Sequence, residues 1–413
     1  MPVQNKANEY LCHLNLIFKI QLMDEKKTML KVNNLAQIRE GAVQFGDMTL
    51  MVGPQASGKS IFLQLLKLVI DRQNIADTLK TYGYDWGKKA DNFLELYFGE
   101  SMSGIWKPHT EVKLDGESIT RSTFLPKKGA PVKASKEEKL FYIPAQRVVT
   151  MRAGWPLNFL AFDTGDPYIL KSFSETLRVL MEKEWSNGGL IFPKAGRLQE
   201  SLRKPLEASI FYGASVELEK SSLKKRFILE IEKSRLPYMA WSAGQKEFMP
   251  LLLSLYHLIP PSKISRKGAI EWVVIEEPEM GLHPRAIQSV LLLCLELMDR
   301  GYKVVISTHS PVLIELAWAI GFIKKMKGQV NDLCDLFSLP KSTNLKPVFQ
   351  TAIDQKLFKT YYFQRFDDGV RIKDISSLDA GSNDEAMSNW GGLSEFASRA
   401  AEVVAKLAAN EEE

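Results

Sequence analysis

One eight-residue stretch limits what this chain can fold into more than any other feature. Residues 53–60 read Gly-Pro-Gln-Ala-Ser-Gly-Lys-Ser and fit the phosphate-loop pattern G-x-x-x-x-G-K-[ST] without a mismatch. An apolar run, residues 48–52, precedes the loop, and a helical pattern, residues 61–70, follows it. Because the motif requires a strand before it and a helix after it, this context favours a phosphate-binding loop over a chance glycine-rich turn.

The residue types in this loop predict how a nucleotide would be held. The glycines let backbone N–H groups turn inward around phosphates at a helix N-terminus. The lysine supplies a positive charge to the β- and γ-phosphate oxygens, and the last serine is a hydroxyl ligand for Mg²⁺. The residues assigned to nucleotide binding are Gly53, Gln55, Ala56, Ser57, Gly58, Lys59 and Ser60, with Ser60 also assigned to the metal.

Composition excludes few classes of function. Among 413 residues, Lys plus Arg number 54 and Asp plus Glu 49, and a net charge of +5 is too small to indicate nucleic-acid binding. Cys12, Cys294 and Cys334 lack metal-ligand spacing, which predicts reduced thiols in a cytosolic protein. No stretch has the length of a membrane span or the apolar core of a signal peptide. We therefore expect a cytoplasmic protein without a membrane domain.

Three later apolar runs end in polar side chains. Ligands of α/β sheets bind at the carboxyl ends of the strands, so these residues are expected near the phosphate loop. The runs are residues 140–143 before Gln146, residues 272–275 before Glu276 and Glu277, and residues 303–307 before His309.

Each of these side chains has an expected role. Gln146 can hold a Mg²⁺-bound water, although a capping glutamine on a surface turn is the alternative for that segment alone. Glu276 can bind Mg²⁺ through water while Glu277 orients the attacking water. His309 can hydrogen-bond a γ-phosphate, although a lone histidine is more often structural. Ser242 is a good helix N-cap and Gly244 permits close backbone approach, so residues 242–245 predict a second phosphate-facing helix start, with an ordinary cap as the alternative.

In chain order, residues 53–60, 146, 242–245, 273–277 and 309 resemble five motifs of the ABC-type ATPases. These are the phosphate loop, the Q-loop glutamine, the signature, the acidic strand tip and the switch histidine. Residues 277–284 and 143–147 resemble the branch with RecF, OLD-type and SMC-like proteins. The resemblance implies ATP with Mg²⁺, and a signature (Ser242, Gly244, Gln245) that acts on ATP bound to a second subunit. Two positions depart from the pattern: Ala243 replaces a glycine, and Glu276 stands where aspartate is commoner.

The expected fold is an α/β ABC-type ATPase head, with a β-layer, a central mixed sheet and a helical and β insertion between phosphate loop and signature. We expect residues 1–150 to form lobe I with the phosphate loop and Q-loop. Residues 151–240 would form the inserted subdomain, residues 241–325 would complete the ATPase, and residues 326–413 would form a C-terminal hairpin and helix.

The resemblance also suggests partners. No heptad run indicates SMC-type arms, and no acidic nuclease domain of the TOPRIM type is recognised after His309. Stand-alone ATPases of this kind resemble subunits of anti-phage systems, including the PARIS type, which has a separate nuclease. We expect a homodimer or higher oligomer that controls a separate effector, such as a nuclease or toxin, in response to a phage protein. A DNA-binding RecF-like repair ATPase is the alternative, and a transporter ATPase is the third.

Three segments could form contact surfaces. The basic loop at residues 127–139 and the basic hairpin at residues 216–231 could each contact a partner, or could be solvated. A C-terminal helix over residues 393–409 follows a polar linker, residues 380–388. Its apolar face is expected to contact another subunit or a partner, with packing on its own ATPase domain as the alternative.

Overall fold

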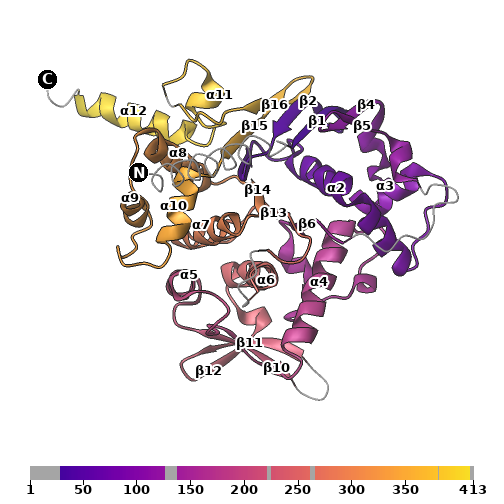
Figure 1. The fold of residues 1–413 in the computed structure, drawn as a ribbon, viewed down its shortest axis with the longest axis horizontal. Helices are drawn as coiled ribbons and strands as arrows, with labels where there is room; N and C mark the ends of the chain where they lie inside the picture. The colour runs from indigo at the N-terminus through magenta and orange to yellow at the C-terminus, as the bar shows by residue number, and fades with distance from the viewer. Residues whose placement is uncertain (1–27, 126–136, 221–224, 261–265, 380, 410–413) are drawn as a thin grey trace, which may run out of the picture.

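The computed structural model describes residues 28–125, 137–220, 225–260, 266–379 and 381–409 (Figure 1). Its main feature is a ten-stranded mixed sheet with the order β5-β4-β1-β2-β16-β15-β3-β14-β13-β6. The expected α/β fold with a central mixed sheet is confirmed. Residues 1–27, and residues 127–136 of the predicted basic loop, lie outside the described residues.

Four parallel strands form the core of this sheet. They are β3 (Met48–Val52), β14 (Lys303–Ser307), β13 (Trp272–Glu276) and β6 (Leu140–Ile143). Every residue of β3, β6 and β13 is buried, as expected for strands covered on both faces. Because the four strands are parallel, their carboxyl ends lie at one edge of the sheet.

The C-terminal hairpin lies inside this sheet. Strands β15 (Phe358–Phe366) and β16 (Gly369–Asp374) form the predicted hairpin around Asp367 and Asp368. β15 pairs in parallel with β3, and β16 pairs in parallel with β2 (Ile38–Gln44). The hairpin therefore joins the β-layer to the strand that carries the phosphate loop.

The β-layer and two helices cover one face of the core. The layer contains β1 (Met29–Leu35), β2, β4 (Trp106–Leu114) and β5 (Glu117–Ile119), all paired antiparallel. Helices α2 (Lys59–Thr81) and α3 (Ala90–Phe98) share its apolar core.

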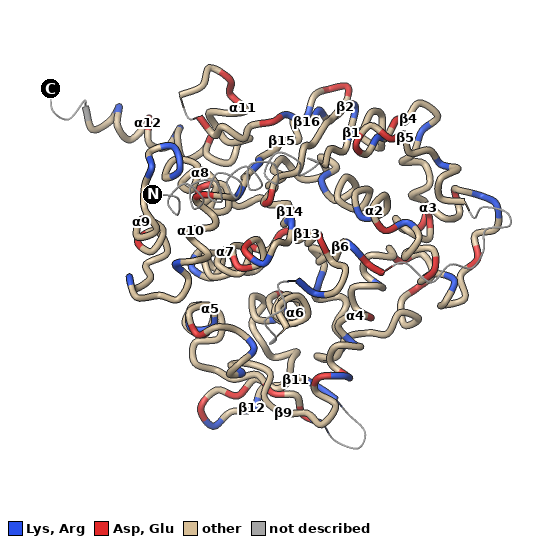
Figure 2. Tube along the Cα trace, in the orientation of Figure 1, with Lys and Arg blue, Asp and Glu red and all other residues tan. Residues whose placement is uncertain are grey.

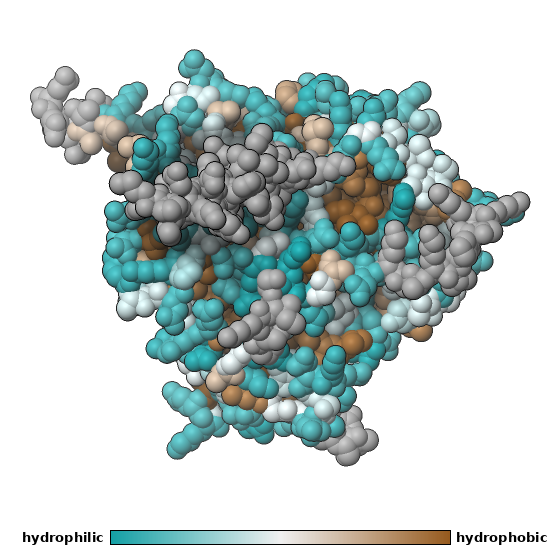
Figure 3. Space-filling model, in the orientation of Figure 1, coloured by the Kyte–Doolittle hydropathy of each residue, from teal (hydrophilic) through white to brown (hydrophobic). Residues whose placement is uncertain are grey.

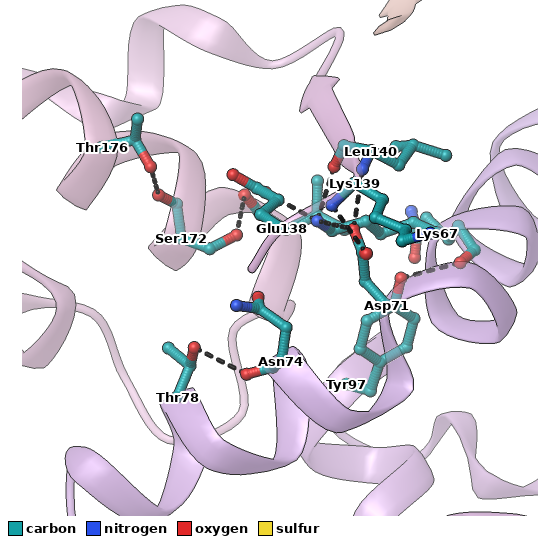
Figure 4. A network of polar contacts seen from close by, with 12 residues as sticks. Lys67, Asp71, Asn74, Thr78, Tyr97, Glu138, Lys139, Leu140, Ser172 and Thr176 are labelled. Atoms are coloured by element: carbon teal, nitrogen blue, oxygen red, sulfur yellow. Dashed lines mark hydrogen bonds and ion pairs between the residues drawn. The ribbon is translucent and has the colours of Figure 1, made fainter. Parts of the chain in front are cut away.

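A buried ion cluster fixes α2 to the start of β6 (Figure 4). Helix α2 bends at Asp71, whose φ is −112°. Lys67 Nζ lies 2.7 Å from Asp71 Oδ2 and 2.6 Å from Glu138 Oε1, and it donates to the Leu140 carbonyl at 2.6 Å. Asp71 in turn accepts the backbone N–H groups of Lys139 and Leu140. These two carboxylates raise the pKa of Lys67 well above its usual range despite burial, so the lysine stays charged.

Helices from the rest of the chain cover the opposite face, and one apolar core joins them to the sheet. They are α4 (Tyr168–Glu184), α5 (Glu200–Leu206), α6 (Ala243–Leu258), α7 (Pro284–Asp299), α8 (Pro311–Lys325), α9 (Val330–Leu336) and α10 (Lys346–Asp354). A separate four-stranded sheet lies below α6 in Figure 1, with the order β12-β11-β10-β9. It contains β9 (Gly189–Phe192), β10 (Ser215–Lys220), β11 (Lys225–Ile231) and β12 (Ser234–Pro237), and β7 (Met151–Arg152) pairs with β8 (Trp155–Pro156).

The basic hairpin is the predicted β10–β11 pair, but its described cations are occupied. Arg226 forms an ion pair with Glu219 at 2.7 Å, and Lys225 lies over the Trp155 ring. Lys220 donates to the Ser186 carbonyl. The hairpin thus has a solvated, internally neutralised face, which supports the second of the two interpretations.

The expected polar linker is partly structured. Residues 385–388 form the short helix α11 (Glu385–Ser388), because Asp384 caps it and Ala386 is buried. Trp390 packs beside Trp318 of α8, and the final helix, α12 (Glu395–Ala409), then extends beyond the body of the molecule (Figure 1). Among the described residues, no helix is both long enough and apolar enough to cross a bilayer.

Candidate nucleotide site

The phosphate loop connects β3 directly to α2, as predicted. Its backbone requires small residues, because Gly53, Ala56 and Gly58 all have positive φ values of 146°, 55° and 94°. A Cβ at Gly53 would lie 2.8 Å from the Phe363 carbonyl oxygen of β15. Gln37, in the turn between β1 and β2, donates to the Ala56 carbonyl at 3.0 Å. The β-layer and the C-terminal hairpin therefore both hold the loop in shape.

The side chain of Lys59 lies against the backbone of its own phosphate loop. Its Nζ donates to the Gly53 carbonyl at 2.7 Å and to the Pro54 carbonyl at 3.0 Å. Burial lowers the pKa of Lys59 from 10.5 to about 8, while nearby glutamates, Glu277 first, oppose this shift. The ammonium group is thus poorly compensated, and a phosphate would supply the missing negative charge.

The tip of β13 carries two carboxylates in different environments. Glu276 is buried and accepts the Ala145 N–H at 3.3 Å. Burial raises the pKa of Glu276, and the nearby Ser60 and Tyr142 hydroxyls oppose the shift. Even so, Glu276 Oε1 and Tyr142 Oη make no well-formed hydrogen bond to any described residue. A buried carboxylate oxygen that lacks a well-formed hydrogen bond is suited to a cation or its water ligands.

Glu277 is half-buried and faces the switch histidine. Its Oε1 lies 3.5 Å from His309 Nε2, and this contact lowers the pKa of Glu277. Glu277 has a φ of 43°, an uncommon backbone conformation for glutamate, and its N–H donates to the Ser307 carbonyl at 2.9 Å. The turn therefore positions the side chain beside the end of β14, at the cost of local strain.

Glu279 was not predicted as a site residue, yet it holds the switch segment. Its Oε1 accepts the Thr308 hydroxyl at 2.7 Å and the His309 N–H at 2.6 Å. Its Oε2 is buried without a described partner. At the acidic strand tip, Glu279 thus holds the backbone of His309, while Glu277 faces its side chain. The triplet Glu-Pro-Glu was visible in the sequence, but nothing local indicated the partner of its second glutamate.

Gln146 is exposed and lies three residues after the end of β6, at the same sheet edge as the acidic tip. The adjacent Arg147, also unpredicted, is fully buried. Its guanidinium donates to the Glu276 carbonyl at 2.7 Å, the Glu277 carbonyl at 3.1 Å and the Glu247 carbonyl at 3.4 Å. Arg147 therefore connects the Q-loop segment to the acidic tip and to helix α6.

The signature begins α6 and is exposed at Ser242 and Ala243. Ser242 caps the helix by accepting the Gln245 N–H at 3.3 Å, and Gln245 Oε1 accepts the Ser242 N–H in return. A Cβ at Gly244 would lie 2.5 Å from the Gly281 carbonyl oxygen, so glycine allows close contact with the loop that follows the acidic tip. The predicted cap is present, while Ser242 and Ala243 remain free to contact a ligand outside their own chain.

A family model for the "AAA domain, putative AbiEii toxin, Type IV TA system" matches residues 174–315, which include the signature, acidic tip and switch histidine. The Old nuclease of Escherichia phage P2 is 42% identical to this chain over 83 residues. Over residues 174–315 this chain is therefore similar to that family of AAA domains. The match to the phage protein covers 20% of this chain and only 14% of the phage protein.

Two solved SMC heads are also similar to this chain. One, bound to the C-winged helix domain of ScpA, is 12% identical, covers 87% of this chain and 98% of its own, and has a TM-score of 0.40. The SMC head domain from Thermotoga maritima is 13% identical, covers 84% and 97%, and has a TM-score of 0.34. These likenesses are weak, so the fold assignment is based on the strand order and the motif positions.

Proposed function

We propose that the chain binds ATP with Mg²⁺, hydrolyses it between two copies of itself, and uses this cycle to control a separate effector in anti-phage defence. The observation that carries the proposal is the convergence of Lys59, Glu276, Glu277 and His309 at one sheet edge. Glu276 Oε1 and Glu279 Oε2 are buried without a well-formed hydrogen bond, and the charge of Lys59 is poorly compensated. Both observations support a site that is completed by phosphate and a cation.

Each side chain then has a task. Lys59 binds the β- and γ-phosphates once it leaves its loop carbonyls. Ser60, Glu276 and Gln146 would hold Mg²⁺ directly or through water, and the ion would neutralise charge on the phosphates. Glu277 is ionised and orients the attacking water. His309, held by Glu279, donates to the γ-phosphate.

The exposed signature supports a two-chain site. Ser242 and Ala243 are accessible in the single chain, and α6 presents N–H groups at its start. We propose that Ser242, Gly244 and Gln245 contact ATP bound to the phosphate loop of a second copy. The matching family model describes a putative AbiEii toxin, and the matching nuclease is a phage protein. These descriptions apply to those proteins, and they support the proposed defence role of this chain.

Substitution of Lys59 with Ala tests the proposal. It should abolish ATP binding in calorimetry without lowering the melting temperature, because the uncompensated charge contributes little to packing. Lys88→Ala changes an exposed lysine in the same lobe and should bind ATP normally. Unchanged affinity in a folded Lys59→Ala protein would disprove the nucleotide site.

A second experiment separates effector control from the DNA-repair alternative. The protein encoded beside this chain is co-expressed with native or Lys59→Ala chain, and its toxicity and nuclease activity are measured with and without phage. Effector control predicts that release of activity depends on Lys59. The DNA alternative predicts instead saturable binding of duplex DNA that requires ATP and weakens with salt.

A further inference from the structure

Helix α12 leaves its whole apolar face uncovered. Phe396 is 79% exposed, Val404 66%, Leu407 61% and Val403 58%. In Figure 3, the described part of this helix projects from the body of the molecule at the upper left. A free helix of 15 residues is marginal in water, so a stable α12 needs a surface against that face.

The charges of α12 indicate what that surface is. Glu395, Arg399, Glu402 and Lys406 form one stripe along the helix. Consider a second copy of α12 placed antiparallel to the first, with the two-fold axis between residues 400 and 401. In this arrangement Glu395 lies opposite Lys406, and Arg399 lies opposite Glu402. The stripe is therefore complementary to a reversed copy of itself. A parallel copy in register would place each charge opposite its own kind.

The apolar positions fit the same arrangement. It places Val404 opposite Ala397 on the same face, so this large side chain faces a small one. Ala400 and Ala401 lie at the crossing point, where small side chains allow two helices to approach closely. Large-to-small pairing across facing positions is how helices interdigitate.

We propose that α12 is a pairing helix that binds antiparallel to α12 of a second copy of this chain. This contact uses none of the residues of the proposed nucleotide site, so it does not require ATP. The outer stripe of α8, with Trp318 and Phe322, is the competing surface within the chain, but Trp318 already packs against Trp390. The exposed side chains of α12 make no such contact.

Disulfide trapping tests the orientation. In the antiparallel pair, the two copies of residue 400 are about 1.5 Å apart along the axis, and the two copies of residue 396 are about 13.5 Å apart. A disulfide requires Cα atoms about 4.4–6.8 Å apart. Ala400→Cys should therefore form a cross-linked dimer under mild oxidation, and Phe396→Cys should not. Both variants carry Cys12→Ser and Lys59→Ala, which removes one native thiol and the ATP-dependent contact.

Each outcome is decisive. Cross-linking through Ala400→Cys alone supports the proposal. Cross-linking through both positions indicates parallel pairing and overturns it. Cross-linking through neither indicates that α12 docks on its own chain or on a different protein, and also overturns it.

Charge variants give an independent test in the full chain without nucleotide. Arg399→Glu with Lys406→Glu makes an all-acidic stripe, and Glu395→Lys with Glu402→Lys makes an all-basic stripe. Light scattering should show that each variant alone has half the native mass, and that a mixture regains the native mass. If either variant alone keeps the native mass, or the mixture does not associate, the proposed pairing is wrong.

Discussion

Lys59 makes ATP binding sensitive to pH. Because burial lowers its pKa to about 8 in the free site, the lysine is partly neutral above that pH. Phosphate favours the charged form, so ATP binding should take up a proton, and affinity should fall about tenfold per pH unit above about pH 8.

Calorimetry at about pH 9, in two buffers with different ionisation enthalpies, measures this uptake. We expect nearly one proton per ATP at pH 9 and a small fraction of one near pH 7.5. Lys59→Arg should abolish the uptake, because a guanidinium stays protonated. Absence of proton uptake by the native chain at pH 9 would contradict the assignment.

Glu277 should be required for turnover but not for binding. Glu277→Gln keeps the shape of the side chain and removes the ionised acceptor that orients water. We expect turnover to fall by about 100-fold or more while ATP remains bound and the two-chain form accumulates. Glu271→Gln, at the opposite end of β13 in an exposed ion pair with Lys139, is the matched control. Turnover at the native rate in Glu277→Gln would assign the water to another residue.

At the scale of elements, the bend in α2 depends on a buried charge. Lys67→Met leaves Asp71 and Glu138 without their shared cation, which should lower the free energy of unfolding by about 3–5 kcal/mol. Lys204→Met breaks another i,i+4 lysine–carboxylate pair, but both its side chains are exposed, at 68% and 62%. That control should change stability by less than about 1 kcal/mol. Denaturant unfolding of both variants measures the difference, and equal losses would show that the cluster is not structural.

The sequence predicted the elements that depend on interactions between neighbouring residues, and missed those that depend on residues far apart in the chain. The phosphate loop, the strand tips and the Ser242 cap depend on neighbouring residues, so their local patterns were sufficient. Arg147 and Glu279 were missed because their partners are supplied by other strands and helices. The hairpin β15–β16 was predicted as a hairpin, but not its place between β2 and β3. The contact between Leu357 and Asp47 at its base joins residues 310 positions apart.

At the scale of the whole molecule, hydrolysis should require two chains. A mixture of Lys59→Ala chain and Ser242→Arg chain can form hybrid dimers with one doubly damaged site and one intact site. ATPase activity should therefore return on mixing, and rise with total protein concentration. If mass measurements show exchanged subunits while the mixture stays as inactive as each variant, the shared site is disproved.

The two proposed contacts between copies would also determine the assembly. Each is two-fold, and they use different surfaces, the signature edge and α12. Two different two-fold interfaces on one chain connect copies into a closed ring or an open filament rather than a simple dimer. Native mass measured with and without ATP would show whether both contacts form together.

The position of β15 and β16 also affects how the chain is made. During synthesis, β3 emerges early, but its neighbour β15 emerges only near the end of the chain. At about 5–20 residues per second, the edge of β3 lacks that partner for roughly 15–65 s on the ribosome. An apolar strand with an open edge is a site for wrong pairing with other nascent chains. Chaperone demand during translation should therefore be high until residue 374 has left the ribosome, and chains truncated before β15 should aggregate.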